Sequence, residues 1–141
     1  MLRMAKSHLS LRMDTRTRQR LAERARSERL PQGTLVNRYV EEGLRRDRHP
    51  RITFIAKISG RVPSLLSRPR LLIAHIVETW RASKRSVKAT ADYHRLNEED
   101  VRAALAYYAE FQEEIDDWIA WNRAEADRLE REWRREKKLG A

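Results

Sequence analysis

The sequence predicts a mainly α-helical protein with a few short strands, built from three consecutive parts. Helical periodicity covers most of the chain, whereas period-two alternation is confined to short segments near the N-terminus and just after residue 50. Turn residues near positions 31 and 49 separate the helical stretches, and the last helical stretch is too long for so small a body to cover. We therefore expect a strand-helix-helix head at 1–49, an accessory hairpin-plus-helix domain at 50–112 and a helical tail at 113–141.

Composition and charge restrict the classes of function. The 141 residues include no cysteine, which excludes disulfides, thiolate metal ligands and cysteine nucleophiles and fits a reducing cytosol. No apolar run approaches the roughly 20 residues of a membrane span, and the N-terminus lacks a signal-peptide core, so we expect a cytoplasmic protein without membrane contact. Basic and acidic residues number 13 and 6 in 1–49, 10 and 2 in 50–97, and 8 and 13 in 98–141. The basic front fits contacts with DNA phosphates.

The segment Ser7–Met13 alternates polar and apolar side chains, which predicts a strand. Side chains of a strand alternate between its two faces, so one face is apolar and the other polar. Paired with the same strand of a second copy, the polar face forms a ribbon that fits the major groove. We expect the chain to read DNA as a dimer. The apolar face consists of Leu9, Leu11 and Met13, and the polar, base-reading face of His8, Ser10 and Arg12.

Two amphipathic helices complete the head. The first is expected over residues 15–27 behind the N-cap Asp14, with arginines around a thin apolar stripe. A turn at 30–33 precedes a second helix capped by Thr34, which ends before Pro50. One strand face and two thin stripes cannot close a core in so few residues, so we expect a shared dimeric core. The stripe of the second helix consists of Val36, Tyr39, Val40, Gly43 and Leu44.

Residues 50–112 predict the accessory domain. A hairpin is expected from strands 52–55 and 62–66 around Ser59-Gly60, followed by a break at Arg68-Pro69-Arg70 and helices over 72–80 and 86–93. Asn97 is expected to cap the next helix in a capping box with Asp100, which gives a helix-turn-helix outline. Three consecutive carboxylates open that helix and would repel phosphate, so we interpret the domain as a packing unit rather than a second DNA reader.

The tail keeps near-helical apolar spacing without glycine or proline from residue 98 to 138. An unbroken helix would extend roughly 60 Å, so its second half is expected to fold back near residues 112–114 or to project toward a partner. The alternatives are packing on its own domain and a coiled coil with a dimer mate. Large aromatic anchors dominate protein interfaces. The expected partner-binding residues are Ile115, Trp118, Ile119, Trp121, Leu129 and Trp133, with Arg128, Arg131, Arg134 and Arg135 near the tip.

Residues 6–46 resemble the ribbon-helix-helix, or CopG-like, family of bacterial repressors. The resemblance implies that the polar strand face contacts bases and that the start of the second helix binds phosphate through its amides. Pro31-Gln32-Gly33 stands where that family often carries a serine-rich lead-in. The implied phosphate contacts are Lys6, Gln32, Gly33, Thr34 and Leu35.

The head together with the patterns at Val101–Tyr108 and Glu113–Ile119 resembles the broad VapB-like kind of type II antitoxin. The resemblance implies a protein that represses its own operon at an operator DNA and neutralises a cognate toxin, a PIN-like ribonuclease, through its C-terminal region. It also implies that a basic side chain of the tail enters the carboxylate-lined cleft of the toxin. Spacing does not select one of the four tail arginines.

Catalysis is not expected. The sequence holds no phosphate-cradling glycine loop, no paired-histidine metal motif and no recognisable nucleophile context, so we expect no cofactor and no metal. Two other binding functions stay open: a stand-alone dimeric repressor without a toxin partner, and an architectural protein that binds DNA by charge alone. The alternating polar face at residues 8–12 argues against the architectural protein. A head whose arginines are merely solvated, with no DNA role, is the remaining alternative.

Overall fold

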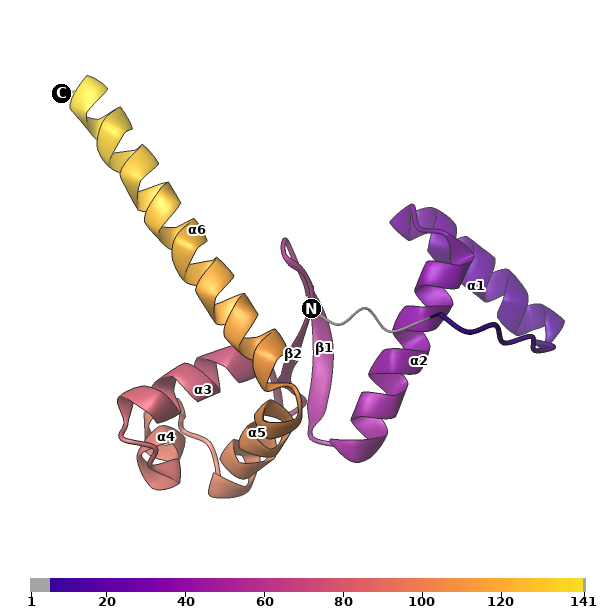
Figure 1. The fold of residues 1–141 in the computed structure, drawn as a ribbon, viewed down its shortest axis with the longest axis horizontal. Coiled ribbons are helices and arrows are strands. Elements are labelled where there is room, and N and C mark those ends of the chain that lie inside the picture. The colour runs from indigo at the N-terminus through magenta and orange to yellow at the C-terminus, as the bar shows by residue number, and fades with distance from the viewer. Residues whose placement is uncertain (1–5, 141) are drawn as a thin grey trace. The chain divides into compact units, whose positions relative to one another are not determined.

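The computed structural model describes residues 6–140 (Figure 1). The chain divides into two compact units, residues 1–43 and 44–141. The predicted head ended at residue 49, whereas the structure groups the last turn of the second helix with the second unit. The physical reason lies in Arg45, whose side chain bonds to Tyr107 and Glu114, both in residues 44–141.

The first unit contains α1 (Thr15–Glu28) and most of α2 (Gln32–Arg48). The cap predicted for α1 is confirmed, because an Asp14 carboxylate oxygen accepts a hydrogen bond from the Thr17 amide at 3.4 Å. The cap predicted for α2 is wrong. The helix starts two residues before Thr34, and the Pro31 carbonyl accepts from the Leu35 amide at 3.2 Å. Proline favours a helix start because its fixed φ suits the first turn and it has no amide to leave unpaired.

The strand predicted over Ser7–Met13 is not present. Among the described residues no segment pairs with it, and residues 6–14 have no regular secondary structure. An extended segment becomes a strand only when a neighbour satisfies its backbone groups, and the expected neighbour was the same segment of a second copy. The ribbon-helix-helix arrangement is therefore not formed by one chain. The His8 Nε2 atom and the Ser10 Oγ atom nevertheless lie 2.8 Å apart.

The second unit begins with an antiparallel sheet of β1 (Ile52–Lys57), β2 (Gly60–Leu65) and β3 (Arg68–Leu72), in the order β1-β2-β3. The predicted hairpin is confirmed. Gly60, at φ +110°, supplies the turn conformation that other residues rarely adopt. The predicted break at Arg68-Pro69-Arg70 is wrong, because these residues start β3. Proline lacks an amide donor, but β3 lies at the sheet edge, where that donor is not needed.

Helices α3 (Ile73–Ala82), α4 (Val87–His94) and α5 (Glu98–Glu110) follow the sheet. Both predicted caps are confirmed: the Ser86 hydroxyl accepts from the Ala89 amide at 3.0 Å, and the Asn97 side chain accepts from the Asp100 amide at 2.8 Å. Apolar side chains from the sheet and from α3, α4, α5 and α6 form one core. Its largest fully buried members include Ile52, Leu65, Ile73, Ile76, Tyr107 and Ile115.

The last helix, α6 (Gln112–Leu139), starts after a break at Phe111, next to residues 112–114, where one of the two predicted alternatives placed a fold-back. Its 28 residues extend about 42 Å. Residues 112–125, called the seated half, carry Ile115 and Ile119 into the core. Residues 126–139, called the projecting half, are exposed throughout and extend away from the other helices of this unit (Figure 1). The predicted boundary at residue 113 therefore differs from the structure, because the seated half completes the core of the accessory domain.

Candidate nucleic-acid and partner interfaces

The first unit carries an arginine surface with little internal neutralisation. Arg24 pairs with Glu28 at 3.2 Å, and Arg38 pairs with the same carboxylate at 2.8 Å. Six other arginines are exposed and make no ion pair with a described residue, so their charges are open to a polyanion. They are Arg12, Arg16, Arg18, Arg20, Arg26 and Arg29.

The same unit also exposes its apolar side chains. Ala25 and Leu35 are the buried hydrophobic residues among those described in this unit. A groove of about 810 Å³ opens beside α1 and α2, and Leu9 is 80% exposed. Two buried apolar side chains make a small core, so the groove is a candidate surface for a partner. Its apolar lining is Met13, Leu21, Val36, Tyr39 and Val40.

The start of α2 retains most of its predicted phosphate-binding groups. The amides of Gln32, Gly33 and Thr34 lie in the first helical turn, where no intrahelical acceptor exists. Leu35 differs, because its amide donates to the Pro31 carbonyl and its side chain is fully buried. Lys6 is exposed in the segment before α1. Three of the four amides predicted to bind phosphate therefore have no intrahelical acceptor.

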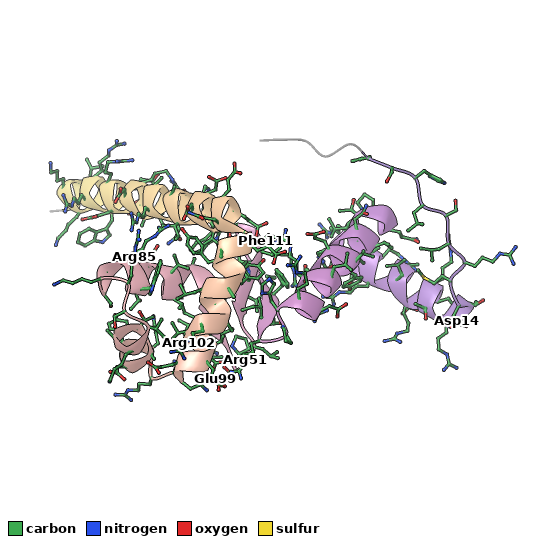
Figure 2. All side chains as sticks on the ribbon, turned by 60° about the horizontal axis from the view of Figure 1, so that its bottom comes forward. Asp14, Arg51, Arg85, Glu99, Arg102 and Phe111 are labelled. Carbon is green, nitrogen blue, oxygen red and sulfur yellow. The ribbon has the colours of Figure 1, made fainter. Side chains whose placement is uncertain are left out.

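In the second unit, three carboxylates open α5, and they differ in their surroundings. Two of them, Glu99 and Asp100, bond to Arg51. Asp100 is only 6% exposed, and its two oxygens accept from Arg51 at 2.9 Å and from Ser67 at 3.1 Å. Arg51 also donates to Glu99 at 2.8 Å, and the labelled side chains of Arg51 and Glu99 lie together in Figure 2. The hydrogen bond to Asp100 raises the pKa of the Arg51 guanidinium. Asp100 thus binds the chain before β1 instead of closing the predicted capping box.

The junction between α5 and α6 is held by Arg45. Its guanidinium donates to the Tyr107 hydroxyl at 2.9 Å and to Glu114 at 2.8 Å, and it lies 3.9 Å from the centre of the Phe111 ring. Figure 2 shows Phe111 at this junction. A cation that meets a ring and two acceptors together is well held, and these contacts set the direction in which α6 leaves the domain.

A second link joins α3 to the first turns of α6. The Arg81 guanidinium bonds to the Tyr108 hydroxyl and to Asp116, and the Tyr108 hydroxyl donates to Asp116 at 2.8 Å. Burial alone would raise the pKa of Asp116, but the hydrogen bonds from Tyr108 and Arg81 lower it overall. Sequence spacing did not identify this group, because its members come from three helices.

The seated half of α6 borders a groove of about 410 Å³, called the α6 groove. Three of the predicted partner-binding residues, Ile115, Trp118 and Trp121, line it, and Trp118 donates through Nε1 to the Ser59 hydroxyl at 3.1 Å. Ile115 and Ile119 are packed into the core, so they offer a partner little surface. The groove is also lined by Val62, Pro63 and Leu72 from the sheet and by Glu114 and Asp117 from α6.

The projecting half presents two kinds of side chain. Leu129 and Trp133 remain 53% and 57% exposed, and Lys137 lies 4.8 Å from the Trp133 ring centre. Two of the tail arginines are paired within the helix: Arg128 with Glu125 and Glu132, and Arg134 with Glu130. Arg131 and Arg135 make no ion pair within the described part of the chain. The structure thus distinguishes the tail arginines that pair within the helix from those that do not, which sequence spacing could not do.

No protein-family model, curated protein or solved structure matches this chain. Within residues 6–140 no histidine and carboxylate side chains gather in a group that could hold a metal ion. No helix of the described part is long and apolar enough to cross a membrane.

Proposed function

We propose that this chain is a dimeric repressor and antitoxin that binds operator DNA through its first unit and a toxin protein through α6. It acts by binding alone, without catalysis, in the cytoplasm. The observation that carries the proposal is the first unit, which exposes an arginine surface and an uncovered apolar groove within one small body. Neither surface is explained by the packing of a single chain.

The apolar groove supports dimerisation. When the segment 7–13 pairs with its counterpart in a second copy, Leu9, Leu11 and Met13 gain a shared apolar surface to cover. The polar faces of both segments then form one ribbon, and the 2.8 Å separation of His8 Nε2 and Ser10 Oγ supports a common face for these two side chains. The exposed arginines of α1 and the amides at the start of α2 would contact the flanking phosphates.

The projecting half of α6 supports the partner-binding role. An isolated helical segment of this length is marginal in water, so a surface that covers Leu129 and Trp133 would stabilise it. Trp133 is the largest exposed side chain there and the expected anchor. Arg131 and Arg135 are the basic side chains best placed to meet acidic groups of the partner, because Arg128 and Arg134 already pair within the helix. A PIN-like ribonuclease toxin, the class implied by the resemblance of the sequence, offers such groups.

The DNA-binding proposal is tested by Arg12→Ala against the matched variant Arg26→Ala. A base-reading arginine contributes about 1–3 kcal/mol of discrimination. Arg12→Ala should therefore reduce the preference for DNA from the chain's own promoter over random DNA by roughly 5- to 150-fold. Arg26→Ala should weaken both complexes equally, as loss of a phosphate contact does. Fluorescence anisotropy at fixed salt measures both affinities. An equal loss of affinity for both DNAs in Arg12→Ala would exclude base reading by Arg12.

The partner-binding proposal is tested by truncation after Glu125. This cut removes the projecting half and leaves the core intact, whereas a cut after Gln112 would also remove Ile115 and Ile119 from the core. The full and truncated chains are expressed with their native operon and purified at high salt. A small nuclease retained by the full chain alone, with operator binding preserved in both, is the expected result. Recovery of the homodimer alone would identify a stand-alone repressor.

A further inference from the structure

We propose that the α6 groove is a binding site for a small organic cation with an apolar body. The cationic end would lie against the seated half of α6, and the apolar body would lie on the floor of the groove. This site goes beyond the proposed function, because it concerns a small-molecule ligand and neither DNA nor a protein partner.

The size and the lining of the groove suit a small molecule. Its volume of about 410 Å³ falls within the range of about 300–1,000 Å³ that small-molecule pockets occupy. Most of its lining residues are apolar, and such a surface holds the apolar part of a ligand without selecting its charge. Besides two tryptophans, the apolar lining consists of Val62, Pro63, Leu72, Ala74 and Ile115.

One face of α6 supplies two carboxylates and two indoles to the groove. This group, called the α6 cluster, consists of Glu114, Asp117, Trp118 and Trp121. Each member lies three or four positions along the chain from two of the others. Residues at these spacings are neighbours on a helix surface, with about 5–6 Å between their Cβ atoms. The four side chains therefore form one compact group rather than a scattered set.

The negative charge of the α6 cluster is only partly neutralised within the chain. Arg45 donates to one oxygen of Glu114 at 2.8 Å, and the other oxygen bonds to no described residue. Asp117 makes no ion pair and no hydrogen bond with a described residue. Arg61 also lines the groove, but it comes from the hairpin, and its guanidinium donates to the Phe54 carbonyl at 3.2 Å. The wall formed by α6 therefore favours a positive charge.

The two indoles select an organic cation over a metal ion. Mg²⁺ and Ca²⁺ require several oxygen ligands, whereas an indole face attracts a weakly hydrated organic cation. Trp121 is 45% exposed, so its ring is accessible. Trp118 is already oriented, because its Nε1 donates to the Ser59 hydroxyl at 3.1 Å and the His75 ring lies edge-on at 6.0 Å between ring centres. A ring that is ordered beforehand lowers the entropic cost of binding.

The surroundings of Trp118 add no positive charge at neutral pH. Burial lowers the pKa of His75 below its ordinary value, so its imidazole is neutral there and does not repel a cation bound beside the indole.

Indole signals in proton–nitrogen NMR spectra of the full-length chain test the site. The chain has four tryptophans, and phenylalanine substitutions assign their Nε1–H signals. The probe is benzyltrimethylammonium. Phenylmethanesulfonate is the matched control, because it carries the same benzyl group with the opposite charge. Trp133 is the internal control, because it is 57% exposed on the same helix but has Lys137 at 4.8 Å from its ring centre.

Benzyltrimethylammonium should shift the Trp118 and Trp121 signals with a Kd on the order of millimolar, as expected for a ligand of this size. It should bind at least about tenfold more tightly than phenylmethanesulfonate, because it gains both the cation–π contacts and the attraction of the carboxylates. The signals of Trp80 and Trp133 should not move.

Asp117→Asn should weaken binding of benzyltrimethylammonium about twofold to fivefold, as loss of an exposed ion pair does. Glu113→Gln is the matched control, because Glu113 is an unpaired carboxylate of the same helix that does not line the groove. Its affinity for the probe should be unchanged. An unchanged Trp80 signal in both variants shows that the fold is retained.

Equal shifts with both probes would reduce the site to apolar contact and overturn the proposal. An equal response of Trp133 would also overturn it, because binding would then occur at any exposed indole. A stronger response to N-acetylarginine amide than to benzyltrimethylammonium would instead assign the groove to a basic side chain of a protein partner. Absence of any shift at probe concentrations well above millimolar would exclude the site. DNA binding by the first unit enters none of these results.

Discussion

Replacing Asp100 by alanine should lower the free energy of unfolding of residues 44–141 by about 2–3 kcal/mol. The side chain is almost completely buried at the start of α5 and joins three parts of the unit: the chain before β1, the turn before β3 and the helix itself. Glu98, two residues earlier, is the matched control, because its carboxylate lies 3.8 Å from Arg102 with both side chains well exposed.

The magnitude follows from three contributions. The Arg51 bond is charge-assisted but half exposed, at 46% for the Arg51 side chain, so it contributes about 1.5 kcal/mol, the low end of its range. The Ser67 hydroxyl contributes up to about 1 kcal/mol, reduced because it rebonds to water in the variant. A carboxylate in the first helical turn contributes about 0.5 kcal/mol through the helix dipole. Glu98→Ala should lower the free energy of unfolding by less than about 0.5 kcal/mol.

Urea denaturation followed by tryptophan fluorescence measures both variants. All four tryptophans lie in residues 44–141, so the signal reports this unit and not the first one. The urea midpoint of Asp100→Ala should fall with an unchanged slope, which shows that stability and not compactness changed. Equal costs for the two variants would refute the reasoning, since the three carboxylates would then be interchangeable surface charges. DNA affinity that rises in Asp100→Ala would contradict the interpretation of α5 as a packing element.

Two further predictions use the same denaturation assay. Ile115→Ala should lower the free energy of unfolding by about 2–5 kcal/mol, because the Ile115 side chain is 1% exposed. Leu139→Ala, at an exposed position of the same helix, should change the free energy of unfolding little. A loss below about 1 kcal/mol for Ile115→Ala would place the seated half outside the core. Burial lowers the pKa of His75 below its ordinary value of 6.5, so His75 binds a proton more readily in the unfolded chain than in the folded one. Stability should therefore fall as pH drops from 7 to 5, and His75→Gln should fall less steeply; parallel pH profiles would exclude this contribution.

The residues that end and begin helices were predicted well because their signals are local. Asp14, Ser86 and Asn97 each accept from an amide three residues later, so the contact is contained in the sequence pattern. The hairpin around Gly60 is local in the same way, whereas a break before α6 was expected only as one alternative, because an unbroken helix would be too long. Thr34 failed for an equally local reason, since Pro31 nearby is a better helix start.

The candidate surfaces were predicted only in part. Periodicity identified an apolar stripe along α6, but it does not distinguish side chains that pack into the core of the same chain from those that stay exposed. Ile115 and Trp133 lie on the same side of the helix, 18 residues apart, and the body of the domain reaches only the first of them. The strand expected over Ser7–Met13 depends on a neighbouring strand that residues 6–140 of one chain do not supply.

By itself, the sequence determined the mainly helical class, most element boundaries, the charge asymmetry and the alternating segment near the N-terminus, because each depends on residues within a few positions of one another. Only the tertiary structure decided that Asp100 is a buried anchor, that β3 adds an edge strand and that α6 is half core and half free. Those outcomes depend on groups far apart in the chain, such as Arg51 and Asp100, 49 residues apart, which folding brings within hydrogen-bonding distance.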